Sequence, residues 1–104
     1  MTTRATLPSK AAGETVSTVF DFTSRLAVGE TISMQVCTAT VWSGVDPSPS
    51  AVISGAATAS GAKVTQKLAA GILGVIYYIV CTITTSLGQT LEMSGYLAVV
   101  PEVV

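Results

Sequence analysis

The chain has 104 residues, enough for one domain with a single modest core. Charged residues make up 11% of it and the formal net charge is -1, so the sequence offers no basic surface for nucleic acid and no acidic surface for a basic partner. Histidine is absent, which excludes Ser-His-Asp and Cys-His catalysis, and two cysteines alone do not make a zinc site. We therefore expect no enzyme, no metal and no cofactor.

An extended arm followed by one β-domain is predicted. Residues 1–14 are polar and small, so we expect an arm outside the sheet, and residues 15–104 are expected to form the domain. Residues 15–23 alternate between apolar and polar side chains, which predicts the first strand. In the connection that follows, Gly29 favours a tight turn, and Glu30 is expected to be a solvated turn charge.

A long second strand is predicted from Thr31 to Trp42. Its apolar residues change phase near Val36 and Cys37, which indicates a β-bulge or a strand that crosses between sheets. Trp42 ends this strand, before a loop rich in proline. Two roles are open for this side chain: a lid over the core, or a residue that contacts a partner.

The middle of the chain gives weaker signals. A short strand is predicted at residues 51–54, and residues 55–61 read as a loop or a poor edge strand. Residues 63–68 alternate cleanly with Lys63 and Lys67 outward, where lysines would protect a sheet edge from pairing with other molecules.

Residues 74–100 are the most informative segment, predicted as two strands joined by Ser86–Gln89. Every second residue falls on one apolar face. That face carries Val75, Tyr77, Ile79, Cys81, Ile83, Leu91, Met93, Leu97 and Val99. The opposite face is also apolar, because it carries Tyr78, Val80, Tyr96, Ala98 and Val100. Tyr78, Val80 and Tyr96, together with Trp42, are our candidate protein interface; the alternative is that the monomer covers them with its own second sheet or arm.

The whole pattern gives six or seven short strands and no segment with helical periodicity longer than one turn. An all-β fold is predicted, best an immunoglobulin-like β-sandwich of antiparallel strands, with a small barrel as the second choice. The apolar run of residues 68–83 is shorter than the about 20 residues of a membrane-spanning helix. The first 15 residues lack the apolar stretch of a secretory signal, so we expect no export from the cytoplasm.

Cys37 and Cys81 have two possible arrangements. They could face each other across the core of a sandwich, from an early strand and a late one. Alternatively, they are two buried free thiols that behave as small apolar side chains, which suits a protein folded in reducing cytosol.

Two blocks of the sequence, at residues 20–33 and 64–99, carry a recognisable pattern. The first block contributes Phe20, Asp21, Phe22, Leu26, Gly29, Glu30, Thr31 and Ile32. The second contributes Gly71, Gly74, Tyr77 or Tyr78, Cys81, Thr84, Thr85, Ser86 and Gly88. These blocks resemble a family of small immunoglobulin-like virion proteins of tailed bacteriophages, the head–tail or fibre–tail adaptors. The family often has a tryptophan inside the strand after the first block, whereas this chain has only Trp42, and residues 43–62 match no part of the pattern.

The resemblance implies a non-enzymatic structural protein of the virion, made in the host cytoplasm. It would be an adaptor in the neck, tail or fibre-attachment region, present in multiple symmetric copies and contacting other virion proteins, without a nucleic-acid or membrane partner. Two alternatives remain: a capsid decoration (cement) protein, and a host- or carbohydrate-binding module on a tail fibre. The loop from Trp42 to Asp46 is the candidate site for the last of these.

Overall fold

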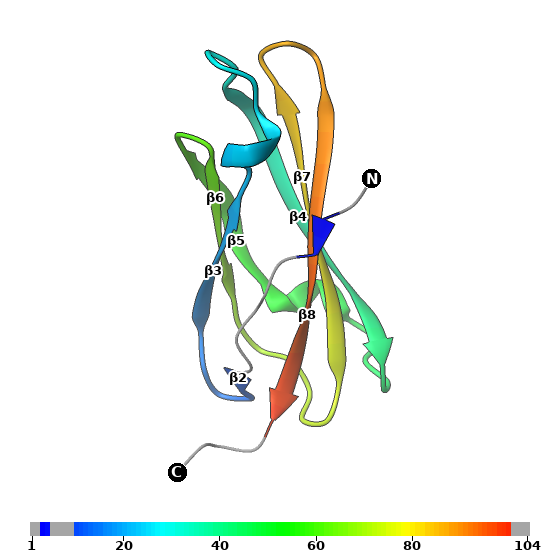
Figure 1. The fold of residues 1–104 in the computed structure, drawn as a ribbon. Helices are drawn as coiled ribbons and strands as arrows, with labels where there is room; N and C mark the ends of the chain where they lie inside the picture. The colour runs from blue at the N-terminus through cyan, green and yellow to red at the C-terminus, as the bar shows by residue number, and fades with distance from the viewer. Residues whose placement is uncertain (1–2, 5–9, 101–104) are drawn as a thin grey trace.

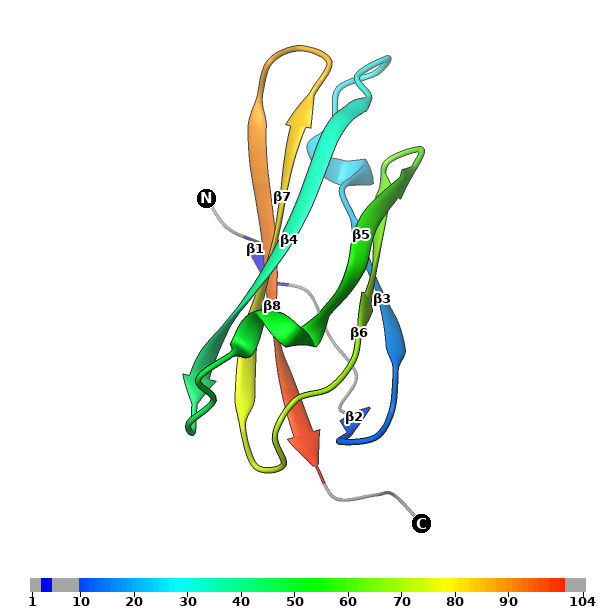
Figure 2. The ribbon, with the colours of Figure 1, turned by 180° about the vertical axis from the view of Figure 1, so that it is seen from behind.

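The chain folds into two β-sheets that lie face to face (Figure 1; Figure 2 from behind). The computed structural model describes residues 3–4 and 10–100. Within this part, the only helical segments are two short 3-10 turns, η1 (Thr23–Arg25) and η2 (Pro49–Val52), and no helix has the length and apolar character needed to cross a membrane. The all-β prediction is confirmed.

The larger sheet is built on three long strands, β4 (Ile32–Ser43), β7 (Ile76–Thr85) and β8 (Thr90–Val100). β7 lies in the middle and pairs antiparallel with both neighbours. A short turn at residues 86–89 joins β7 to β8, so the predicted hairpin is confirmed together with its connection.

The smaller sheet has the order β3-β6-β5, from β3 (Val16–Asp21), β6 (Lys63–Leu68) and β5 (Ile53–Ser60). β6 is its central strand and pairs antiparallel with both others. The lysines of β6 point outward as predicted, but they do not lie on an edge strand, so the predicted edge protection is wrong. Alternation in a sequence identifies the outward face of a strand and carries no information on its place in the sheet.

β5 is an edge strand with an irregular register, which explains its weak sequence signal. Its pairing with β6 shifts between Ser54 and Thr58, and Gly55 adopts φ +75° there. The buried side chain of Gln66 compensates for the shift, because its Nε2 donates hydrogen bonds to the carbonyls of Ser54 (3.2 Å) and Gly55 (3.1 Å). A side chain from the next strand thus satisfies carbonyl groups that the shifted ladder leaves open.

Parts of the predicted arm join the larger sheet, contrary to expectation. β1 (Thr3–Arg4) and β2 (Lys10–Ala11) each pair in parallel with β8. The backbone N–H of Ala11 then donates to the Glu14 carboxylate at 2.7 Å, which forms the turn toward β3. The remainder of residues 1–9 lies outside the described part of the chain, and the boundary between arm and domain at residue 14 stays a prediction.

The core lies between the sheets and is formed by their inward faces. All nine inward residues predicted for the hairpin line it, eight of them buried and Leu91 partly so. The smaller sheet and its flanks contribute five apolar side chains with no exposed surface: Phe20, Phe22, Val52, Val64 and Leu68. The predicted core face of residues 74–100 is therefore confirmed.

β4 has no bulge at the predicted place. Its register with β7 is continuous from Met34 to Val41, and the irregularities lie at the two ends of this stretch. Val36 is exposed whereas Cys37 and Ala39 are buried, so the apparent phase change is simply a strand that is apolar on both faces. The predicted bulge at Val36–Cys37 is wrong for this reason.

Cys37 and Cys81 are direct register partners on the neighbouring strands β4 and β7. Both are buried free thiols in the core. They therefore lie side by side in one sheet, and the interpretation in which they face each other across the sandwich is wrong.

Candidate interaction surface

The outward-facing side chains of β4, β7 and β8 form a continuous surface, which we call the outer face. The pairing register places them in adjacent rows. The outer face comprises Met34, Val36, Thr38, Thr40, Trp42, Ile76, Tyr78, Val80, Thr82, Thr84, Glu92, Ser94, Tyr96 and Ala98.

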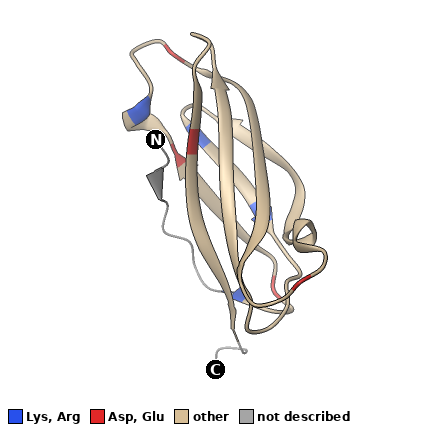
Figure 3. Cartoon of the chain, turned by 90° about the vertical axis from the view of Figure 1, so that its right-hand side faces the viewer, with Lys and Arg blue, Asp and Glu red and all other residues tan. Residues whose placement is uncertain are grey.

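The outer face is almost free of charge. Figure 3 looks onto this side of the molecule, and the three long strands carry a single acidic band. That band is Glu92, the one charged residue in β4, β7 and β8, and it accepts a hydrogen bond from the hydroxyl of Thr82 at 3.3 Å. The outward face of the smaller sheet differs, because it carries Asp21, Lys63 and Lys67.

Three aromatic rings meet on the outer face near the end where β4 finishes and β7 begins. Tyr78 and Tyr96 are register partners on β7 and β8, and their ring centroids are 5.3 Å apart. The Trp42 ring lies 5.0 Å from Tyr96 and 6.5 Å from Tyr78. All three pairs are tilted, at 40–56°, within the range of edge-to-face and offset geometries that aromatic pairs prefer.

Trp42 is an exposed residue and not a lid over the core. Its side chain is 63% exposed, at a position where the register between β4 and β7 is irregular. Two roles were open for it from the sequence, and the exposure excludes the lid.

Val80 lies on the same face, next to the aromatic cluster. It stands two residues beyond Tyr78 on β7, between Thr38 of β4 and Ser94 of β8. Val80, Tyr78 and Tyr96 are each half-buried. The fold thus brings the four predicted interface residues onto one face, on the side away from the second sheet; that they lose their remaining exposure in an assembly stays a prediction.

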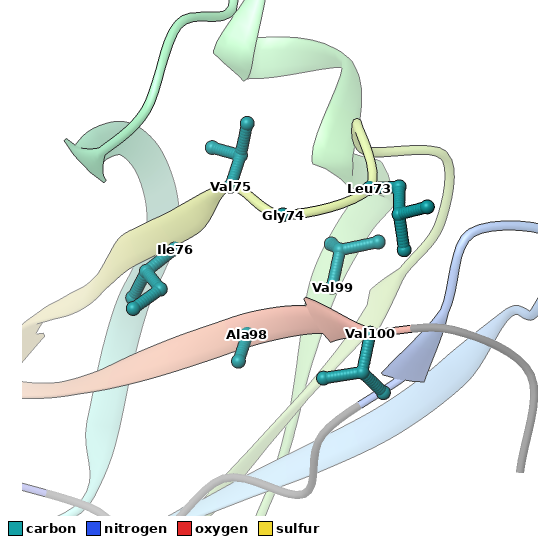
Figure 4. Close-up of a pocket in the computed structure, with 7 residues that line it drawn as sticks. All are labelled: Leu73, Gly74, Val75, Ile76, Ala98, Val99 and Val100. Atoms are coloured by element: carbon teal, nitrogen blue, oxygen red, sulfur yellow. The ribbon is translucent and has the colours of Figure 1, made fainter.

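An apolar groove continues the outer face at the end of the hairpin where β7 begins and β8 ends. It has a volume of about 370 Å³ and is lined by Leu73, Gly74, Val75, Ile76, Ala98, Val99 and Val100. Figure 4 shows Ile76, Ala98 and Val100 on one side of the two strands and Val75 and Val99 on the other. Ile76 and Ala98 are register partners next to the Tyr78–Tyr96 pair on the outer face, so the groove adjoins the cluster through these two residues.

The sequence reasoning missed Met34 and Val36 as members of this surface. They are 68% and 55% exposed on β4, although both are large apolar residues. The phase change in β4 was the signal that could have identified them. In a regular strand, Met34 and Val36 must point to the side opposite the buried Cys37 and Ala39.

The first sequence block and the hairpin turn are tied together at one end of the sandwich. Glu30 is buried there, not solvated as predicted, and its carboxylate accepts the N–H of Ala27 at 2.8 Å. The hydrogen bond from the Thr85 side chain, followed by that from Ala27, holds the pKa of Glu30 below its ordinary value. The N–H of Ser86 donates to the Thr31 carbonyl at 2.8 Å, which joins the two segments directly.

The opposite end is held by Tyr77, whose side chain has no exposed surface. Its hydroxyl donates to Asp46 Oδ2 at 2.6 Å and accepts the N–H of Ile72 at 2.8 Å. Burial, followed by the hydrogen bond to Asp46, raises the pKa of Tyr77. Asp46 therefore fixes the loop between β4 and η2 to the β7 strand, which gives this carboxylate a structural role.

The described part of the chain holds no cluster of three or more His, Cys, Asp and Glu side chains suited to a metal ion. What the outer face offers is contact area: a rigid sheet, three exposed or half-exposed rings and a row of hydroxyls. This composition resembles that of protein interfaces, at whose centres aromatic residues are enriched and charged residues depleted.

Comparison with known proteins identifies the family. No curated protein matches the chain. The sequence model of one family, described as the podophage GP4 fiber-tail adaptor protein gp77, matches residues 10–98. The match includes residues 43–62, for which the two blocks gave no counterpart. It spans most of the chain and agrees with the resemblance of the two blocks, so the chain belongs to this family of bacteriophage fibre–tail adaptor proteins.

Proposed function

We propose that this protein is a non-enzymatic structural component of the virion that joins a fibre to the phage tail, and that its outer face is the surface on which the partner protein docks. Family membership supports a role in the tail and contacts with tail and fibre proteins. Copies arranged with the symmetry of the tail would each present the same face to an equivalent neighbour.

The aromatic cluster is the observation that carries this proposal. Trp and Tyr dominate the binding energy of protein interfaces because they contribute large contact area at little loss of side-chain entropy. Here three such rings stand on a rigid three-stranded platform whose surface has a single charge. A partner with an apolar surface can cover the aromatic cluster and desolvate few charges, because Glu92 is the one charged residue of these three strands.

A carbohydrate-binding module fits the same residues less well. Sugar rings stack on a flat, open aromatic surface, whereas these rings are inclined to one another by 40–56°. A capsid decoration protein would use the same kind of surface, and the family match favours the tail over the capsid.

The test is to place a charge on the outer face of the protein in the phage itself. Thr38→Glu puts a carboxylate beside Val80, on an exposed position of β4. Ser17→Glu is the matched control, because it makes the same kind of change at an exposed position of the smaller sheet, opposite Lys67. Trp42→Ala is the second variant, since it removes the most exposed ring of the cluster.

We expect virions of the Thr38→Glu and Trp42→Ala variants to have lost fibres, measured by electron microscopy and by the amount of fibre protein on purified particles. Virions of Ser17→Glu should carry the wild-type amount. Melting of each purified variant shows whether it is folded. Full fibre occupancy on particles of both outer-face variants would refute the proposal; occupied particles that fail to adsorb would instead indicate a host-binding module, and capsids that break under stress would indicate a cement protein.

A further inference from the structure

The cysteines of the core lie in an arrangement that the adaptor role does not use. Cys37 of β4 and Cys81 of β7 stand directly opposite each other, and both side chains point into the same core. Directly opposed residues on antiparallel strands have Cα atoms about 4.5–5.5 Å apart, which lies within the range that a disulfide spans. The separation of the two backbones therefore allows a bond without a change in the pairing of the strands.

We propose that Cys37 and Cys81 are an oxidation site, and that they form an intramolecular disulfide when the protein leaves the reducing cytosol. Both are free thiols in the structure, as expected for the protein in its reduced form. A virion released from its host enters an oxidising medium, where such a bond persists.

Oxidation by glutathione disulfide proceeds in two balanced steps. The Cys37 thiolate attacks one sulfur of glutathione disulfide, forming a mixed disulfide and releasing one glutathione thiolate. Cys81 then loses its proton and attacks the Cys37 sulfur, which expels the second glutathione. The protein loses two protons and two electrons, and one glutathione disulfide becomes two molecules of glutathione.

The structure favours Cys37 as the first thiol to react. The hydrogen bond from Cys81 lowers the pKa of Cys37, whereas the same interaction and burial raise the pKa of Cys81. Cys37 also lies on β4, which pairs with β7 alone among the described strands, so local opening of this edge strand exposes it first. Cys81 is on the central strand β7 and has no exposed surface.

The bond would fix the edge strand β4 to β7, directly beneath the outer face. Trp42 is on β4, whereas Tyr78 and Val80 are on β7, so the disulfide would hold the two strands that carry most of the candidate interface. It would also close a long loop of the unfolded chain, which stabilises a protein mainly by restricting the unfolded state.

The experiment compares reduced and oxidised full-length protein. The wild-type chain is refolded in a glutathione redox buffer, blocked with iodoacetamide in denaturant, and its intact mass is measured. We expect a monomer lighter by two hydrogen atoms that takes up no iodoacetamide until it is reduced, with a melting temperature roughly 10–20 °C above that of the reduced protein. Cys37→Ala and the double Cys37→Ala/Cys81→Ala variant should melt at temperatures that do not depend on the redox buffer.

Three results would overturn the proposal. The first is full alkylation of both thiols after oxidation, and the second is a bond that forms only between chains. The third is an oxidised monomer that is less stable than the reduced one, because the bond would then distort the native strands. The mass and alkylation measurements need only the wild-type chain, so they decide the question even where an alanine variant does not fold.

Discussion

Replacing Tyr77 with phenylalanine tests how the loops at one end of the sandwich are held. The substitution keeps the buried ring and removes only the hydroxyl, which donates to Asp46 and accepts from the N–H of Ile72. A hydrogen bond to a charged group contributes about 1.5–3 kcal/mol and a neutral one about 1 kcal/mol, while a buried group left without a partner loses its desolvation energy in full. We expect Tyr77→Phe to lower the free energy of unfolding by about 2–3 kcal/mol.

The assay is urea unfolding followed by circular dichroism. The change in the free energy of unfolding is the shift in the urea midpoint multiplied by the m-value, provided that the variants share the same m-value. Tyr78→Phe is the matched control, because Tyr78 is the next residue of β7 and its half-buried ring points to the outer face. This control should change the unfolding free energy by less than about 0.5 kcal/mol. A double-mutant cycle with Asp46→Asn should give a coupling energy of about 1 kcal/mol or more between the two side chains. Equal stability of Tyr77→Phe and Tyr78→Phe would refute the reasoning.

A pH series gives an independent check on the same hydroxyl. The folded protein raises the pKa of Tyr77 above the ordinary value of 10.0. The neutral hydroxyl therefore contributes its full stability below about pH 10, and this contribution is lost as the pH rises through the folded value. The wild type should lose stability more steeply above pH 10 than Tyr77→Phe does, and parallel curves would contradict the assigned pKa shift.

Two further substitutions test the segments that carry the sequence blocks. Gly71→Ala should destabilise the protein by about 1–3 kcal/mol, because Gly71 has φ +91° and a Cβ there would lie 2.8 Å from Val99 Cγ2. Gly74→Ala is the control and should be milder, because Gly74 has a similar φ of +86° but no atom within 4 Å of the added Cβ. Equal melting temperatures of the two variants would show that the contact with Val99 is irrelevant. Glu30→Gln should lower the melting temperature at neutral pH. A carboxylate whose pKa is lowered by folding stabilises the folded state at pH values above its pKa in the unfolded chain, about 4.5, and loses that effect as it is protonated. The difference in melting temperature from wild type should therefore shrink as the pH falls below about 4.5. A difference that is constant with pH would contradict the role of the Glu30 charge.

The hairpin was predictable because its pattern is both long and strictly periodic. Over residues 74–100, one face is buried and the other half-exposed, and the turn between the strands carries Gly88 at φ +81°. The same periodicity located Tyr78, Val80 and Tyr96 on the side away from the core. Periodicity also separates the two neighbouring tyrosines, of which Tyr77 holds the loops and Tyr78 belongs to the surface.

Features that depend on distant segments could not be read from local patterns. Glu30 looked like a solvated turn charge because its partner Thr85 is far away in the sequence. Residues 55–61 read as either a loop or a poor edge strand, because the hydrogen bonds that support the irregular register of β5 come from the side chain of Gln66 on the next strand. The pairing of Lys10–Ala11 with the end of β8 is likewise a tertiary contact, made by a segment with no strand pattern of its own.

The residues on which the family resemblance rests and the residues of the outer face are almost entirely different sets. Gly29, Glu30, Thr85 and Ser86 hold one end of the sandwich, while Gly71 and Tyr77 hold the other. In this chain these positions are constrained by turns, burial and hydrogen bonds. The side chains between the two ends point outward from β4, β7 and β8 and meet no such demand, so the scaffold leaves them free to match a particular partner. The two sequence blocks therefore report mainly on the scaffold, and on the proposed function the aromatic cluster with its nearly uncharged surroundings would set the specificity for a partner.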